Sequence, residues 1–161
     1  MTDEARRSGK PAAPSPDMVD AVLAEESRQE AALVAKEQYV RNEMDRKIAE
    51  AITAAGHKKY RVVYEAFETD EHDCPIDNLD QVAVQGPCRF VAPINFNWGG
   101  HKSKAYRSPV LHDPTWLQVC VCANAMIKRT RDTHHVFLES IERLSTTDDD
   151  GVPHYRFWMG S

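Results

Sequence analysis

Cations and aromatic side chains lie close together in one segment of the chain, residues 96–107. Phosphate recognition needs mobile cations, and single-stranded nucleic acid also needs flat aromatic rings on which its bases stack. The segment supplies both, so it is the clearest candidate for a site that binds nucleic acid or another polyanion. The candidate contact residues are Trp98, His101, Lys102, Lys104, Tyr106 and Arg107.

The charge distribution around this segment allows two explanations. The chain has a formal net charge of −5, yet the stretch 81–131 holds seven basic residues and a single acid. Lys128, Arg129 and Arg131 would extend the same patch, although cations also suit the C-terminal end of a helix because of its dipole. The alternative is internal: the basic stretch pairs with the acidic loop 70–80 and the acidic helix before it, and the overall acidity repels a long polyanion.

A second candidate site could transfer protons. Glu139 stands between Phe137 and Ile141 on one face of a predicted strand, where its carboxylate would be desolvated. His135 and Arg143 are the neighbours on that face that can pair with it. These three residues predict a small-pocket enzyme if the face is enclosed. On a half-exposed face the same charges would lie in water.

Neither a metal nor a cofactor is expected. The chain has no C-x-x-C and no H-x-x-x-H pair, and the side chains of Cys120 and Cys122 would point about 200° apart on a helix. No G-x-S-x-G motif and no glycine-rich phosphate loop is present. No apolar run approaches the roughly 20 residues that span a membrane, and no apolar segment follows the basic residues at the start. We therefore expect a cytoplasmic protein with reduced thiols that does not enter a membrane.

These candidate residues must be positioned by a helix and a hairpin. Asp113 and Pro114 predict a helix start, and the run that follows has no broad polar face, so a buried helix is expected at about 114–129. Strands at 134–146 and 152–159 should form a C-terminal β-hairpin whose register places Glu142 opposite Arg156. The predicted core residues of these elements are Leu117, Val121, Ile127, Phe137, Ile141 and Phe157.

The preceding chain predicts further elements. Residues 1–16 should be a disordered tail, and 17–56 a helical segment, either one long helix or two helices broken near Ser27. That helix either covers one sheet face or mediates contact with a protein partner or a second copy. A first strand is expected at 60–69 and an interrupted strand at 82–94, with a short strand near 104–107.

Together these patterns predict an α+β domain at 57–161, with an antiparallel sheet packed on the central helix. The favoured function is a non-catalytic binding or assembly domain. Nucleic-acid or polyanion binding through residues 96–107 is the alternative, and a small-pocket enzyme using Glu139 and His135 is the third hypothesis.

Overall fold

The computed structural model describes residues 15–93 and 104–161. The predicted tail therefore lies almost wholly outside the described residues, and so do Trp98, His101 and Lys102 of the predicted anion-binding segment. The chain divides into two compact units, Met1–Ala35 and Lys36–Ser161. The candidate site residues that the structure describes all belong to the second unit.

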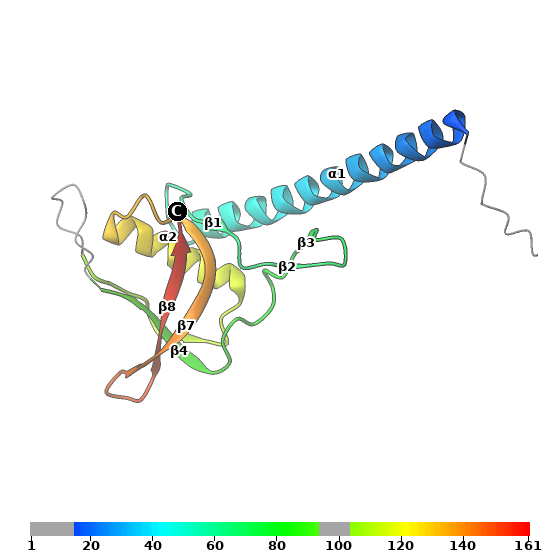
Figure 1. Ribbon diagram of the computed structural model, residues 1–161. Coiled ribbons are helices and arrows are strands. Elements are labelled where there is room, and N and C mark those ends of the chain that lie inside the picture. The colour runs from blue at the N-terminus through cyan, green and yellow to red at the C-terminus, as the bar shows by residue number, and fades with distance from the viewer. Residues whose placement is uncertain (1–14, 94–103) are drawn as a thin grey trace, which may run out of the picture. The chain divides into compact units, whose positions relative to one another are not determined.

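The helix α1 spans Pro16–Ala54 and has no break near Ser27 (Figure 1). Its sequence is rich in alanine, glutamate, lysine and arginine, which are strong helix formers. Gly56 follows with a φ of 83°, a left-handed conformation that glycine adopts without steric penalty. In its last turns Met44, Ile48 and Ile52 are buried, so this end of α1 contributes to the core of the second unit.

Six strands of the second unit form one sheet, in the order β1-β7-β8-β4-β5, with β6 paired to β4. A separate antiparallel pair joins β2 (Glu68–Thr69) and β3 (Pro75–Ile76) around the acidic loop. The strands are β1 (Val63–Tyr64), β2 (Glu68–Thr69), β3 (Pro75–Ile76), β4 (Pro87–Ala92), β5 (Tyr106–Arg107), β6 (Leu111–His112), β7 (Phe137–Thr147) and β8 (Pro153–Gly160).

The α+β class is confirmed, but the prediction of a purely antiparallel sheet is wrong. β1 pairs with β7 in parallel, and β4 pairs with β8 in parallel, so the sheet is mixed. A parallel pair needs a long crossover connection, and here α2 lies in the chain between both partners. The order of strands along the chain predicts the hairpin of β7 and β8, but it does not predict that β1 and β4 pair with the two sides of that hairpin.

The predicted central helix is α2, Trp116–Thr130, and it lies against the sheet (Figure 1). Its cap is Thr115 rather than the predicted Asp113. The Thr115 hydroxyl accepts from the Gln118 amide, and the Gln118 side chain accepts from the Thr115 amide, which together form a capping box. Asp113 instead accepts a hydrogen bond from the Gly86 amide at 2.7 Å, so it fixes the loop before the helix.

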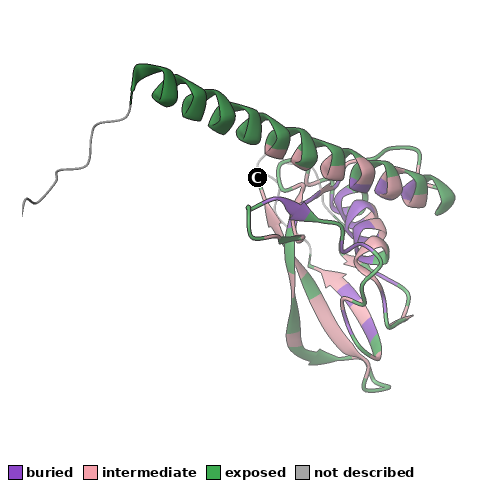
Figure 2. Cartoon of the chain, turned by 90° about the vertical axis from the view of Figure 1, so that its right-hand side faces the viewer, coloured by how far each residue is buried: buried purple, intermediate pink, exposed green. Residues whose placement is uncertain are grey.

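Buried residues concentrate on α2, the last turns of α1 and β4 (Figure 2). Among the predicted core residues, Ile127 is fully buried, whereas five others are only half-buried. Those five are Leu117, Val121, Phe137, Ile141 and Phe157. The prediction was too strong for α2 because one of its apolar faces borders an open groove, described below, instead of a packed neighbour.

The hairpin of β7 and β8 has the predicted register at its centre, where Glu142 lies opposite Arg156 and their side chains form an ion pair at 2.5 Å. The register shifts between Leu138 and Ser140, which leaves Glu139 as an extra residue in a β-bulge. Alternation of side chains therefore breaks at Glu139. Leu138 is fully buried, although regular alternation would place it on the opposite face of β7 from Phe137 and Ile141.

Cys88, Cys120 and Cys122 are free and buried, and Cys74 is buried as well. Burial raises the pKa of the Cys88 thiol to about 11 and also raises the pKa of Cys120, so these thiols stay protonated near neutral pH. Along the described chain, no helix combines the length and the apolar character that crossing a membrane requires.

Candidate anion-binding site

Five cations surround one hollow of about 530 Å³ in the second unit. We call this the basic hollow. It lies between β5 with the residues that precede it and the C-terminal end of α2. Its lining residues are Lys104, Ala105, Tyr106, Arg107, Ala125, Lys128, Arg129 and Arg131.

The end of α2 gathers three of these cations for a local reason. Lys128 and Arg129 occupy the last turn, where the partial negative charge of the helix end favours them. Arg131 closes the helix in a left-handed conformation, with a φ of 61°, and its amide donates to the Ile127 carbonyl at 2.9 Å. The Arg129 side chain donates to the Ala105 carbonyl at 3.5 Å, which joins the helix end to the chain before β5.

Tyr106 forms an uncharged wall of the basic hollow. Its ring centroid lies 6.4 Å from that of Phe157, and the side chain is half-buried. Burial raises the pKa of Tyr106, so the phenol remains neutral and can donate a hydrogen bond. The hollow therefore offers one half-buried aromatic ring beside exposed cations.

Arg107 is already engaged by an acid. It forms an ion pair with Asp148, which also accepts from Arg89 at 2.7 Å and from His154 at 2.6 Å. The hydrogen bond from His154, together with the two arginines, lowers the pKa of Asp148 to about 2, although burial opposes the shift. This cluster fixes the position of Arg107 at the edge of the basic hollow.

The structure also tests whether the basic stretch pairs with the acidic loop. Asp70 pairs with Lys36 at 2.5 Å, and Asp77 pairs with Lys47 at 2.5 Å, so the loop draws its partners from α1. In the part of the chain that the structure describes, no ion pair involves four of the five cations of the basic hollow. These four are Lys104, Lys128, Arg129 and Arg131. Internal pairing thus accounts for Arg89 and Arg107 but not for these four.

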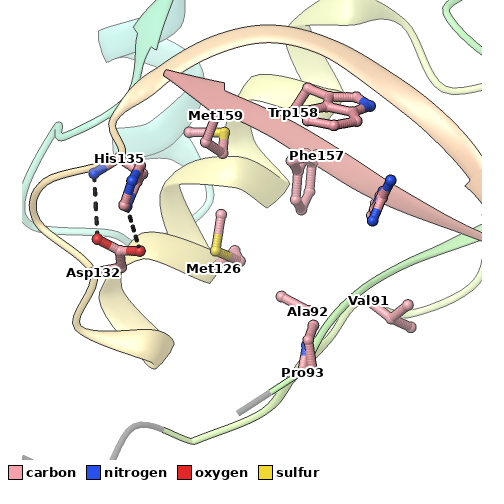
Figure 3. A pocket seen from close by; sticks show the side chains of 10 residues that line it. Val91, Ala92, Pro93, Met126, Asp132, His135, Phe157, Trp158 and Met159 are labelled. Carbon is pink, nitrogen blue, oxygen red and sulfur yellow. Dashed lines mark hydrogen bonds and ion pairs between the residues drawn. The ribbon is translucent and has the colours of Figure 1, made fainter. Parts of the chain in front are cut away.

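A second pocket, of about 290 Å³, contains an acid–base pair (Figure 3). Figure 3 shows Asp132 and His135 at one end of the pocket and Ala92 and Pro93 at the other, with Met126 between them. The His135 Nδ1 lies 2.9 Å from the Asp132 carboxylate. The arrangement leaves His135 Nε2 as the ring atom that could exchange a proton.

Asp132 is held in place by its own loop. Its carboxylate accepts from the amides of His134, at 3.2 Å, and His135, at 3.3 Å, as in an Asx turn. Burial acts to raise the pKa of Asp132, but the hydrogen bonds from the His135 side chain and from the two amides outweigh it, so the pKa is lowered. The carboxylate is therefore ionised and orients the imidazole.

The three residues predicted for proton transfer do not meet in this pocket. His135 lines it, whereas the Glu139 side chain is exposed at the bulge and Arg143 lies opposite Tyr155 on the hairpin. Sequence reasoning missed Asp132, the actual partner of His135. The available signal was an acid three residues before a histidine, directly after the end of a helix.

Within the described ranges, no group of three or more histidine, cysteine, aspartate or glutamate side chains gathers in a way that could hold a metal ion. Comparison of the chain with protein-family models, with curated proteins and with solved structures finds no match.

Proposed function

We propose that this protein is a non-catalytic binding module that holds an anionic partner in the basic hollow. The observation that carries the proposal is the convergence of five cations on one cavity, four of them outside any ion pair of the described residues. Like charges gathered at one place repel each other, and a bound anion relieves that repulsion.

The residue types that line the basic hollow favour binding of an anion over catalysis of a reaction. General acid–base catalysis needs a carboxylate, an imidazole or a similar group near the reacting atoms. The lining residues are cations, one tyrosine and two alanines. Guanidinium and ammonium groups suit recognition of phosphate or carboxylate, and arginine does so with two parallel hydrogen bonds.

The test uses a short labelled single-stranded oligonucleotide as a phosphate-rich probe at several salt concentrations. Each phosphate contact should contribute about −0.7 to the slope of log affinity against log salt. Replacing Lys104, Lys128 and Arg129 together with glutamine should therefore flatten the slope by about 2. Arg131 is left unchanged because its left-handed backbone makes substitution a structural perturbation.

A matched control separates the basic hollow from overall charge. The variant Lys58→Gln, Lys59→Gln, Arg143→Gln changes the net charge equally, at exposed positions that do not line the basic hollow. It should leave the salt slope close to that of the unmodified protein. Equal effects of the two triple variants, or no binding of the probe at low salt, would contradict the proposed site.

A further inference from the structure

An apolar groove of about 610 Å³ lies in the second unit beside α2. The end of α1, one face of α2 and the chain around β5 and β6 form its walls. The lining residues are Ala51, Ala54, Ala55, His57, Tyr106, Arg107, Pro109, Leu111, Leu117, Gln118, Val121, Cys122 and Ala125. We call this the apolar groove.

The apolar groove explains why α2 is less buried than its sequence predicts. Leu117 and Val121 are apolar residues of a helix with almost no polar face, yet both are half-exposed where they line this groove. Alanines from the end of α1 form the facing wall, and small side chains leave the space open. Apolar surface left open in a concavity is a common property of ligand sites.

The apolar groove continues into the basic hollow. Tyr106, Arg107 and Ala125 line both cavities. One end of the apolar groove therefore meets the cations at the end of α2, while its remaining walls are dominated by alanine and aliphatic side chains. A ligand that fills both cavities must combine an apolar body with an anionic end.

We propose that the two cavities form one site for a single-chain amphiphile with a carboxylate or phosphate head, and this inference rests on the proposed anion-binding function. The apolar chain lies against Leu117 and Val121, and the head lies among Lys104, Lys128 and Arg129. The volume of the apolar groove falls within the range of about 300–1,000 Å³ found for small-molecule sites. A few polar groups that fix one end of an apolar ligand are also typical of such sites.

Nucleic acid fits the combined site less well, because phosphates would use only the basic hollow and leave the apolar groove empty. An acidic amphipathic helix from a second copy is the competing occupant. Helix recognition requires a groove long enough for anchors spaced over about two turns. Large apolar side chains are exposed near the start of α1, and such side chains favour self-association. The experiment therefore also measures whether the protein self-associates.

The experiment measures affinity for hexanoate, octanoate and decanoate by calorimetry, below the concentration at which each forms micelles. Each fully buried methylene contributes about 0.8 kcal/mol, which raises the affinity roughly four-fold. In an open groove each methylene is only partly buried, and we expect the affinity to rise at least about two-fold per methylene. Decanoate should therefore bind roughly 16- to 250-fold more tightly than hexanoate. Decyl phosphate distinguishes the two head groups, and decyltrimethylammonium, with a cationic head, should bind weakest.

Two variants separate the apolar groove from the basic hollow. Ala54→Trp fills the groove from an exposed position of α1, and Val121→Gln places a polar group on its wall. Both should abolish the chain-length dependence while keeping the salt-dependent binding of the oligonucleotide. A thermal unfolding transition close to that of the unmodified protein is the check that each variant is folded.

The outcomes distinguish this inference from the proposed function. Oligonucleotide binding that depends on the basic hollow, without any chain-length dependence of alkanoate binding, would overturn the inference alone. If the protein shows neither oligonucleotide binding nor a chain-length dependence of alkanoate binding, both the proposed function and this inference are wrong. If Ala54→Trp instead lowers self-association measured by sedimentation, a second copy occupies the apolar groove and the amphiphile proposal is wrong.

Discussion

Asn124 should be the polar side chain whose loss most weakens the attachment of α2. It is almost fully buried within the apolar helix. Its side-chain oxygen accepts from the Arg61 amide at 2.8 Å, and its side-chain nitrogen donates to the Lys59 carbonyl at 3.1 Å. One side chain thus ties α2 to the segment that leads from α1 into β1.

The cost of Asn124→Ala follows from these two bonds. A typical hydrogen bond contributes about 0.5–1.5 kcal/mol net, and a buried group left without a partner adds about 1–3 kcal/mol. The Arg61 amide is half-buried and would lose its acceptor, whereas the Lys59 carbonyl belongs to an exposed residue and can turn to water. We therefore expect a loss of about 2–3 kcal/mol in the free energy of unfolding.

Urea unfolding followed by tryptophan fluorescence measures this free energy. The midpoint should fall while the slope with denaturant stays constant, since the surface exposed on unfolding is unchanged. Asn124→Leu is the matched variant, because it restores the volume but not the hydrogen bonds. The reasoning fails if Asn124→Leu is as stable as the unmodified protein, because the loss in Asn124→Ala would then come from the cavity.

Two further predictions concern the helix cap and the acidic cluster. Thr115→Ala should lower the free energy of unfolding by about 0.5–2 kcal/mol, because the α2 cap is lost. Thr115→Ser keeps the capping hydroxyl and should be nearly as stable as the unmodified protein. Equal stability of the two variants would contradict the capping role. Asp148 has a folded-state pKa of about 2, below its ordinary 3.8, so its stabilising contribution is present above pH 4 and is lost as the pH falls from about 4 to 2. A series of melting temperatures from pH 6 to pH 2 should show this acid dependence reduced in Asp148→Asn, and an unchanged profile would refute it.

Several local features could be predicted because they depend on residues close in the chain. A long run of helix-forming residues ending at Gly56 predicted the extent of α1. The two strand patterns around the acidic turn with Gly151 predicted that Glu142 lies opposite Arg156, and this pair is observed, although the register shifts between Arg143 and Thr147 beside the turn. The clustering of basic residue types in the stretch 81–131 was likewise visible in the sequence.

Features that depend on distant residues could not be predicted in the same way. Parallel pairing of β1 with β7 joins strands separated by much of the chain. The bulge at Glu139 changes which side chains face the core, and alternation alone gives no sign of it. As a result the predicted Glu139 and His135 pair was not brought together, and Asp132 holds His135 instead.

The sequence by itself determined which side chains were available: an apolar helix, a group of cations and a hairpin with a defined register. Only the tertiary structure decided that the end of α2 and the chain before β5 place Lys104 beside Lys128 and Arg129. It also decided that the face of α2 bearing Val121 opens into a groove that continues to those cations. The physical reason is that helix ends and turns are set by local hydrogen bonds, whereas the surfaces that meet are chosen by packing the whole chain at once.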